Sequence, residues 1–467
     1  MRLVIVGNGV IALTIAHALL HVENTPIKNI AIIGPNAREG SATLAAAAML
    51  NSFAELETGS LNHQVDKDKF SLSREATSLW PDFVRNLADE AGMPEFGIGL
   101  GTFVINNAGA DDLDDANFNA IVGYLKEFGE PFDVANPFDI PNYAPNPRLR
   151  ALRSIYIPRE GWLNPRLLMA ALESALSKSG KVQFLNGEAR SVRMSAGRVS
   201  EIHWSNGDPV EGDVFLLANG ANMTQLLDAS HLGLSIQKMV YGVGATVEIG
   251  SQEHVHTHCV RTPNRGLACG VYSAPYTSSS TLVGASNFLT TKPESDARVG
   301  SVYSLLKSAM EQLNVNFYRA NVLRINTGWR PTTEDTYPLL GRTSIPNLMI
   351  AGGTKRDGLH LSPVIASYMA NLIAHNRDDE RFTAFVPERA PLRTLSREQA
   401  VTKAVRHLVS ANYQHDYQPA KNRMTEQLEA MYRNEVEMVH DMVGANDWGL
   451  PVELIDLYRH GYLGART

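Results

Sequence analysis

The stretch Val6–Ala12, VGNGVIA, decides how the start of this chain folds. It joins a β-branched run, Leu3–Val6, to a segment from Val10 to Leu20 whose apolar residues have helical spacing. A second β-branched run, Asn29–Ile33, follows and stops at a Gly-Pro pair. Strand, glycine-rich turn, helix and strand in this order are typical of a βαβ unit that binds a dinucleotide. The pattern G-x-G-x-x-A in the turn therefore predicts a pyrophosphate at the N-terminus of the helix.

The composition is that of an ordinary globular protein, with 467 residues, 44% hydrophobic and 19% charged, long enough for two or three domains. Lys and Arg number 42 against 49 Asp and Glu, which gives a net charge of −7. Without a long basic run, we expect neither a nucleic-acid partner nor a membrane partner. Cys259 and Cys269 are too few for a disulfide framework or a cysteine zinc site. No signal-peptide pattern and no apolar stretch of about 20 residues occurs, so we expect a cytoplasmic protein.

Strands and helices alternate again later in the chain. Leu72–Ala91 predicts an amphipathic helix, and Asp213–Ala218 and Asn347–Ala351 predict buried strands. From Ile236 to about Val322 the pattern is rich in strands, which indicates a second, antiparallel domain inserted into the nucleotide-binding one. The acidic run Asp111–Asp115 is expected to be a solvated loop.

Four separated segments, together with the glycine turn, carry a resemblance to a known family. They are SATLAAAAML at Ser41–Leu50, IYIPREGWLNPRLLMAAL at Ile155–Leu172, DVFLLANGANMTQLL at Asp213–Leu227, and INTGWRPTTEDTYPLLGRTSIPNLMIAGGTKRDGLHLSPV at Ile325–Val364. In this order they resemble the FAD-dependent D-amino acid oxidase superfamily, in particular its glycine oxidase and sarcosine oxidase branch. The similarity covers about residues 1–393.

The resemblance implies a mixed α/β fold with a glutathione-reductase-type FAD domain and an antiparallel substrate domain. The expected divisions are 1–90, 150–230 and 325–393 for the FAD domain, 91–149 and 231–324 for the substrate domain, and 394–467 for a helical C-terminal extension. The extension lies beyond the similarity and is expected either to cap the substrate domain or to make a dimer contact. Within it, Thr425–Val443 carries a methionine-bearing stripe at helical spacing, which favours a core or docking face over a cofactor site.

The resemblance also implies which residues hold the FAD. They are Gly7, Gly9, Val10, Ile11, Ala12, Asn36, Thr43, Leu44, Ala47, Ala48, Met49, Ala189, Asn219, Gly220, Arg356, Asp357, Gly358, Leu359, His360 and Leu361. Sarcosine oxidases tether FAD through a cysteine shortly before the arginine motif. Here that region, Arg324–Thr327, has no cysteine, so we expect non-covalent FAD.

Two arginines are the first candidates for the chemistry. Arg330, in GWRP, matches the arginine that holds the substrate carboxylate in amino acid oxidases of this type, and a guanidinium can grip a carboxylate with two parallel hydrogen bonds. The alternative for Arg330 is a surface ion pair with Glu334 or Asp335. Arg356, in TKRDG, matches a second arginine at the active site or flavin edge of the glycine oxidase branch; outside that context it would be an ordinary loop residue.

Tyrosine and histidine side chains are further candidates. Tyr241 and Tyr272 lie in predicted substrate-domain strands, where each is either a hydroxyl that closes the site or plain strand packing. His360 is a proton acceptor near the flavin or, as we favour, a structural histidine, because these oxidases need no dedicated base when the amine arrives neutral.

Three histidines alternate in HVHTH, His254, His256 and His258. On a strand they would share one face and could bind a metal, but only Glu253 offers a carboxylate nearby. We favour a solvated strand edge there and expect no metal.

The sequence departs from the family at two more points. The strand ending at Ile33 should be followed by Glu or Asp for the adenosine ribose, but the chain has Gly34-Pro35-Asn36, so Asn36 is left to bind a hydroxyl and Arg38 a phosphate. Thr354 replaces the histidine of the usual G-H-x-R-N-G turn, so substrate preference does not transfer from the branch.

These observations predict an enzyme that oxidises the C–N bond of an amine or amino acid by hydride transfer to flavin N5. Hydrolysis of the imine and reoxidation by O2 to H2O2 would follow. The alternatives are an FAD-dependent dehydrogenase or monooxygenase of a biosynthetic pathway, or a flavin-binding subunit of a larger complex. The expected partners are a small amine or amino acid, O2, and a second copy of the chain bound through the extension.

Overall fold

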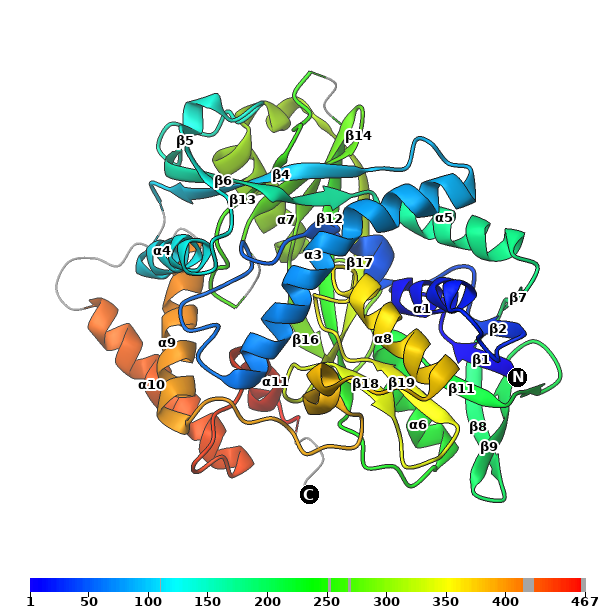
Figure 1. Cartoon of the computed structure of the whole chain (residues 1–467). Helices are drawn as coiled ribbons and strands as arrows, with labels where there is room; N and C mark the ends of the chain where they lie inside the picture. Colours follow the sequence, from blue (N-terminus) through cyan, green and yellow to red (C-terminus); the bar gives the residue numbers. More distant parts are fainter. Residues whose placement is uncertain (110, 251–252, 268–269, 415–423, 463–467) are drawn as a thin grey trace.

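The computed structural model of the chain describes residues 1–109, 111–250, 253–267, 270–414 and 424–462. Two large sheets, a small three-stranded sheet and the helices that pack against them make up the described part of the molecule, which ends in a helical C-terminal extension (Figure 1). The eleven α-helices of the described ranges are α1 Val10–His21, α2 Ala42–Ala45, α3 Gln64–Ala91, α4 Asp112–Glu127, α5 Pro165–Lys178, α6 Met223–Ser230, α7 Val299–Ser308, α8 Ser362–His375, α9 Arg397–Gln414, α10 Met424–Val443 and α11 Ile455–Arg459. None of these helices combines the length and the apolar character that crossing a membrane requires.

The first sheet has six strands in the order β18-β19-β11-β1-β2-β7. Their bounds are β1 Arg2–Val6, β2 Asn29–Ile33, β7 Val182–Leu185, β11 Val214–Leu217, β18 Leu339–Arg342 and β19 Leu348–Gly352. All pairs are parallel except β18 with β19. The β-branched runs read from the sequence lie at the centre of this sheet, because a parallel strand covered on both faces needs apolar side chains on both sides.

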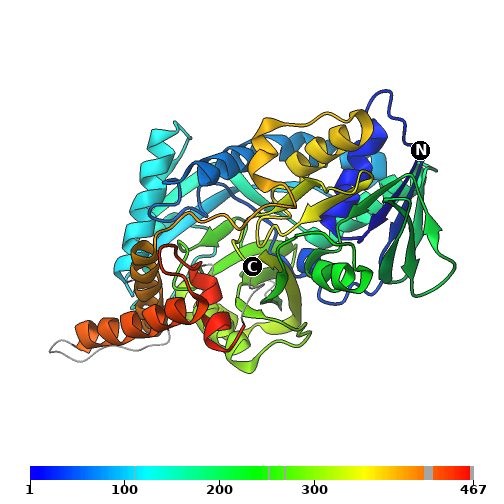
Figure 2. The same cartoon turned by 90° about the horizontal axis from the view of Figure 1, so that it is seen from below.

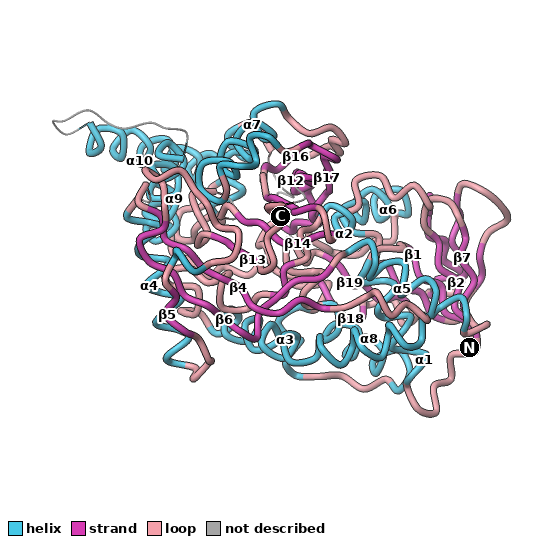
Figure 3. Tube along the Cα trace, turned by 90° about the horizontal axis from the view of Figure 1, so that it is seen from above, coloured by secondary structure: helices cyan, strands magenta, loops and turns pink. Residues whose placement is uncertain are grey.

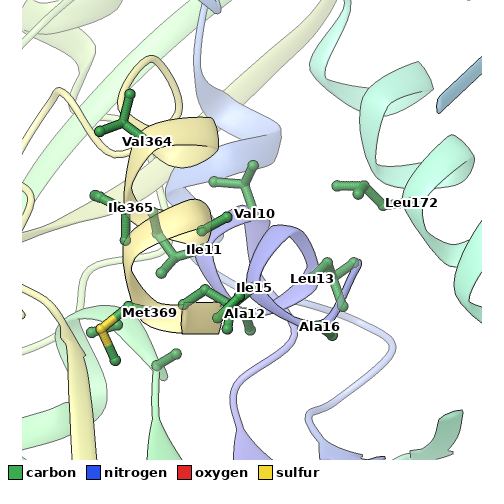
Figure 4. Packing of buried hydrophobic residues seen from close by; sticks show 14 of the residues in the cluster. Val10, Ile11, Ala12, Leu13, Ile15, Ala16, Leu172, Val364, Ile365 and Met369 are labelled. Atoms are coloured by element: carbon green, nitrogen blue, oxygen red, sulfur yellow. The ribbon is translucent and has the colours of Figure 1, made fainter. Parts of the chain in front are cut away.

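Helices and a small sheet cover the two faces of the first sheet. Leu3 and Ile5 of β1 point into a core that includes α1, α5 and α8, whereas Val4 and Val6 point into the core beneath a three-stranded sheet. That small sheet consists of β8 Ala189–Ser195, β9 Arg198–Trp204 and β10 Val210–Glu211. Figure 4 shows α1 packed between α8, which contributes Val364 and Met369, and α5, which contributes Leu172. Burial all round explains why α1 lacks a polar face.

The second sheet has a path of β16-β12-β15-β14-β13-β4-β6-β3, with β17 paired to β12 and β5 paired to β6. Its strands are β3 Met49–Leu50, β4 Ile98–Asn107, β5 Asp133–Ala135, β6 Ala151–Leu163, β12 Met239–Gly250, β13 Cys259–Arg261, β14 Tyr272–Thr277, β15 Ser280–Gly284, β16 Phe288–Thr290 and β17 Asn321–Thr333. The pairs are antiparallel apart from β13 with β4. The expected mixed α/β fold is confirmed: a Rossmann-like parallel sheet, an antiparallel second sheet and a helical C-terminal region.

The sheet pairing differs in detail from the domain division read from the sequence, which remains a proposal. Residues 151–163 and 325–333, assigned there to the FAD domain, pair within the second sheet as β6 and the end of β17. The difference arises because β6 pairs with β4 and β17 pairs with β12, and both partners belong to the second sheet. Sequence patterns mark where a strand lies but not which sheet it joins.

The C-terminal extension packs against the second sheet (Figure 2). Helices α9 and α10 lie against one another, and a short 3₁₀ helix, Val452–Leu454, leads into α11. Their apolar residues share one core with Val240 of β12 and Leu289 of β16. In the tube view of Figure 3 the same helices stand beside α4 and the second sheet. The extension therefore covers one end of the second sheet.

The methionine-bearing stripe of α10 does not form this core. Met431, Met438 and Met442 are exposed, whereas Val436 and Val439 face inward. Of the two expected roles, the core role is wrong for these methionines, and the docking role stays a prediction.

Candidate active site

The glycine turn between β1 and α1 has the geometry that a pyrophosphate needs. Gly7 has φ of +114°, and a Cβ there would lie 2.3 Å from the carbonyl oxygen of Ala218, the residue directly after β11. Gly9 is the N-cap of α1 and offers no side chain to its first N–H groups. The backbone N–H of Val10 donates to Oγ1 of Thr43 at 3.3 Å. It is the one N–H group of this first turn that has a side-chain acceptor among the described residues. The open N–H groups at the positive end of the helix dipole therefore fit an anionic group.

Asn219 and Gly220 follow β11 and border the same turn. The Cα atom of Asn219 lies 2.9 Å from the position of a Cβ on Gly7. The side-chain oxygen of Asn219 is buried without a hydrogen-bond partner among the described residues. Buried polar atoms in proteins are normally hydrogen-bonded, so an unsatisfied one beside a turn of this shape fits a polar cofactor that would supply the hydrogen bond. The residues around the turn thus fit FAD.

Asn36, at the expected ribose position, is exposed. Its backbone N–H donates to Oδ1 of Asn186. Arg38, considered as a phosphate ligand, donates from Nε to the carbonyl of Asn8 in the glycine turn at 3.2 Å. Its guanidinium also pairs with Glu173 of α5. Arg38 thus fixes the turn, and its charge is already compensated.

The small-residue segment at 41–50 lies between the two sheets. Ser41 caps the short helix α2, and Ala48 adopts a left-handed φ of +52°. Oγ1 of Thr246 on β12 donates to the carbonyl of Ala45 at 3.1 Å, and a Cβ on Gly328 of β17 would lie 2.7 Å from the Cβ of Ala45. Thr43, Ala47 and Ala48 are buried in this segment, and Leu44 and Met49 are half-buried. Because its side chains are small, this segment packs closely against β12 and β17. On its other side Thr43 contacts Val10 at the start of α1.

Arg330 lies on β17, half-buried and above Gly244 of β12. Its Nη1 atom donates to the carbonyl of Ser286 at 3.2 Å and to Oδ1 of Asn287 at 3.1 Å. Within the part of the chain that the structure describes, no carboxylate pairs with Arg330. The alternative ion pair with Glu334 or Asp335 does not form; Asp335 pairs instead with Arg389.

The TKRDG loop precedes α8 and holds several of the predicted residues. Nε of Arg356 lies 3.8 Å from Oε2 of Glu55, whose other oxygen pairs with Arg261. Asp357 forms an ion pair with Lys69 of α3 at 2.5 Å. Gly358, Leu359 and Leu361 are buried in the same loop and at its junction with α8. Burial by itself would raise the pKa of Glu55 and Asp357, but the neighbouring cations outweigh burial and lower both.

His360 faces α3. Its Nε2 atom lies 3.0 Å from the carbonyl of Ser73, and the indole of Trp80 donates to the carbonyl of His360 at 2.9 Å. Burial lowers the pKa of His360 and favours the neutral ring. These contacts support the structural role over a proton acceptor.

The two tyrosines are buried in separate places. The hydroxyl of Tyr241 donates to Oδ1 of Asn222 at 3.2 Å, and its ring meets Trp329 edge-on. Tyr272 packs in a small cluster with Ala47 and Ala285. Ala189 opens β8, outside these clusters. Neither tyrosine lines the cavity that contains Arg330, so their catalytic roles stay predictions.

Arg330 and Arg356 line one cavity. Its wall comes partly from the two sheets and the loops between them, with Glu57, Arg265, Leu267, Asn287, Lys355 and the two arginines. The rest of the wall comes from the C-terminal extension, with Lys403, His407, Val452 and Glu453. Sequence patterns identified the two arginines but none of the others. Of the others, only Lys355 lies in a sequence motif that could have identified it, because it adjoins Arg356 in TKRDG.

Ion pairs join the extension to this cavity. Nζ of Lys355 lies 2.5 Å from Glu453, and Nζ of Lys403 lies 3.3 Å from Glu57. Burial would raise the pKa of Glu57, but Lys403, His407 and Arg356 outweigh it and lower the pKa to about 2. Lys355 and its neighbours likewise lower the pKa of Glu453, and Glu57 raises that of Lys403. Glu57, Glu453 and Lys403 are therefore charged at neutral pH.

Two expectations outside the cavity are wrong. Asp111–Asp115 is not a solvated loop: Asp111 caps α4, and buried Asp114 pairs with Arg265 at 2.8 Å. Desolvation raises the pKa of Asp114 to about 6.

The HVHTH segment is irregular and not a strand edge. The side chain of His256 is buried in the core and not solvated. Its Nδ1 lies 2.5 Å from Oγ of Ser273, and burial lowers its pKa to about 4. Cys259 is a buried free thiol, and Cys269 lies outside the described residues.

Comparison with known proteins agrees with this geometry. A family model described as FAD dependent oxidoreductase matches residues 2–372. The bifunctional protein ThiO/ThiG of Trichormus variabilis is 24% identical over 387 residues, which is 82% of this chain and 54% of that protein. The chain thus spans about half the length of the curated relative that it matches over most of its own length.

Solved structures share the fold. Glycine oxidase from Geobacillus kaustophilus has a TM-score of 0.68 at 23% identity, covering 83% of this chain and 99% of its own. Iminodiacetate oxidase from Chelativorans sp. BNC1 has a TM-score of 0.67 at 21% identity, covering 83% and 100%. Both are matched over almost their full length, whereas part of this chain has no counterpart in them.

Proposed function

The chain belongs to the FAD dependent oxidoreductase family, and from this premise we propose that it oxidises the C–N bond of a small amino acid or amine that carries a carboxylate. When bound, FAD supplies the hydride acceptor, and the protein supplies binding and orientation. The glycine turn and α1 would hold the pyrophosphate, and the segment at 41–50 would lie against the flavin. FAD would be bound without a covalent bond.

The observation that carries the proposal is the state of Arg330. Its guanidinium is half-buried and held by two neutral acceptors, Ser286 and Asn287, so its charge is not compensated by any described carboxylate. A half-buried cation without a counter-ion is costly unless an anion arrives. A substrate carboxylate would provide that anion through charge-assisted hydrogen bonds and would fix the Cα–H relative to the flavin.

The charges around the cavity favour the same class of ligand. Five cationic side chains and two carboxylates line it, so an anionic group gains from the local field. His407 is not placed to act as a base: burial lowers its pKa, and its Nδ1 accepts the amide of Leu267 at 3.2 Å. The amine of the substrate would therefore lose no proton to this histidine.

The named relatives support an amine or amino acid substrate. Glycine oxidase and iminodiacetate oxidase are, by name, oxidases of substrates that combine an amine nitrogen with a carboxylate. We propose the same reaction class here, with imine hydrolysis and reoxidation by O2 to H2O2. The substrate itself is not defined by this likeness, because the identities are low and the extension adds its own residues to the cavity.

A peroxide-coupled screen of the flavin-loaded protein tests the proposal. Glycine, sarcosine, D-amino acids and small amines without a carboxylate would be compared, and we expect peroxide from at least one carboxylate-bearing amine. Anaerobic bleaching of the flavin with slow reoxidation by O2 would instead indicate a dehydrogenase, and a hydroxylated product would indicate a monooxygenase. Bleaching only after a partner protein is added would indicate a subunit of a larger complex.

A further inference from the structure

Two histidines and a glutamate meet at the opposite end of α1 from the glycine turn. His17 and His21 are four residues apart on α1 and so lie on one face of the helix, and Glu90 faces them from α3. Nε2 of His17 lies 2.8 Å from Oε2 of Glu90, and Nε2 of His21 lies 3.0 Å from Oε1. All three ligand atoms lie within 4.8 Å of one another. Within the described ranges, this is the one group of three such side chains that close together.

The hydrogen bonds of His21 favour positive charge between its ring and Glu90, supplied either by a proton on Nε2 or by a bound metal ion. Nδ1 of His21 lies 2.9 Å from the carbonyl oxygen of His17, which can only accept, so Nδ1 carries a hydrogen. In the neutral ring Nε2 then presents a lone pair to the carboxylate oxygen, which is repulsive. A cation shared by the two atoms removes the repulsion. The Nδ1–H to carbonyl bond is also the outer contact that orients metal-binding histidines.

The ends of two helices add to the attraction for a cation. His21 is the last residue of α1, and Glu90 precedes the last residue of α3. The negative ends of both helix dipoles therefore converge on the cluster. The ammonium group of Lys178 already binds the carbonyl of Ala91 at the end of α3, at 2.6 Å, which leaves the carboxylate of Glu90 to the histidines. The field at this point thus favours positive charge.

We propose that His17, His21 and Glu90 form a binding site for one divalent transition-metal ion of the zinc class. Two imidazole nitrogens and one carboxylate oxygen are ligands that zinc prefers over magnesium or calcium. The ligands of a tetrahedral zinc ion lie about 3.3 Å apart. The two histidine–glutamate separations, 2.8 and 3.0 Å, would open by a few tenths of an ångström, and all the ligand atoms already lie within 4.8 Å of one another. His17 is 8% exposed by side chain, whereas His21 is 52% and Glu90 36% exposed, which leaves the fourth position to water.

The site would be structural. At a rise of about 1.5 Å per residue, His17 and His21 lie about 12 and 18 Å along α1 from its N-cap at Gly9 in the glycine turn. A metal there would join the C-terminal ends of α1 and α3, two of the helices that share a core with one face of the first sheet. The proposal is independent of the reaction assigned to the cavity.

Zinc titration of the tag-free, flavin-loaded protein after chelator treatment tests the proposal. We expect one zinc ion per chain in competition with a chromophoric chelator, a zinc-dependent rise in melting temperature, and a Co²⁺ spectrum of low coordination number. His21→Ala and Glu90→Gln, both at exposed positions, should each weaken binding at least 10-fold with unchanged flavin content. His203→Ala is the matched control, because His203 pairs with a single carboxylate, Glu201, at 2.6 Å on β9.

Two results would overturn the proposal. Stoichiometry well below one zinc per chain would mean that the cluster is a proton-sharing clamp between two helices. Equal zinc affinity in the wild type, His21→Ala and Glu90→Gln would place the bound ion elsewhere. Because His17 is buried, its variants are not needed for either decision.

Discussion

Replacing Gly244 by alanine should displace the guanidinium of Arg330 without disturbing the second sheet. A Cβ on Gly244 would lie 2.1 Å from Nη1 of Arg330, whereas ordinary contacts begin near 3.4 Å. The atom that must move is the far end of a flexible side chain, and Gly244 has no positive φ, so the strand itself accepts alanine. The guanidinium would shift by more than about 1 Å and lose its alignment with Ser286 and Asn287.

The magnitude follows from what the shift removes. A hydrogen bond to a charged group contributes about 1.5–3 kcal/mol, which corresponds to a loss of about 10- to 150-fold in kcat/KM for a carboxylate-bearing amine. Arg330→Ala, which removes the group, should set the upper limit. The assay is steady-state peroxide formation or anaerobic flavin bleaching, with melting temperature and flavin content measured in parallel.

Gly300→Ala is the matched control, because a Cβ there meets nothing within 4 Å. An amine without a carboxylate is the control substrate and should be oxidised equally by the wild type and Gly244→Ala. The reasoning is refuted if kcat/KM for the carboxylate substrate stays within twofold of wild type in Gly244→Ala. It is also refuted if both substrates lose activity equally.

Three further predictions concern the cofactor turn and the extension. Gly7→Ala should release FAD and lower stability by at least about 2 kcal/mol, because φ is +114° and the Cβ would meet the backbone of Ala218; the flavin-to-protein absorbance ratio and thermal unfolding check this. Glu453→Gln should free Lys355 inside the cavity and raise kcat/KM for dicarboxylic amines relative to glycine, measured in the same peroxide assay. The pKa of Glu57 is lowered to about 2, so its stabilising contribution is full above about pH 4.5 and is lost as pH falls toward 2. Urea unfolding should show a loss of at most about 3 kcal/mol over that window in the wild type and a smaller one in Glu57→Gln.

Local patterns in the sequence were enough to predict the first sheet and its cofactor turn. The strand, turn and helix around Gly7 follow from a β-branched run, two glycines and helical spacing, all of which are properties of neighbouring residues. Arg330 was identified from the resemblance of its short segment GWRP to a family motif. Such features do not depend on how distant parts of the chain meet.

Features that depend on distant contacts were missed. In the sequence Asp114 belongs to an acidic run that predicts a solvated loop, but in the structure it is buried and pairs with Arg265, far along the chain. His256 alternates with two other histidines as on a strand, yet its ring turns inward to Ser273. Lys403 and Glu453 carry no motif and reach the cavity only because the extension docks there. Periodicity and composition contain no information about these pairings.

The pairing of charges around the cavity would let a wall rich in cations select among anionic substrates. Asp114 holds Arg265, Glu55 lies beside Arg356, and the extension supplies a counter-charge to Lys355 and a cation to Glu57. Among the described residues that line the cavity, Arg330 is then the cation left without a carboxylate partner. On the proposed function, a substrate with one carboxylate would meet that need and leave every internal pair intact. A second carboxylate would have to break one of the ion pairs that fasten the extension, so docking of the extension and selection of the substrate would be coupled through the same side chains.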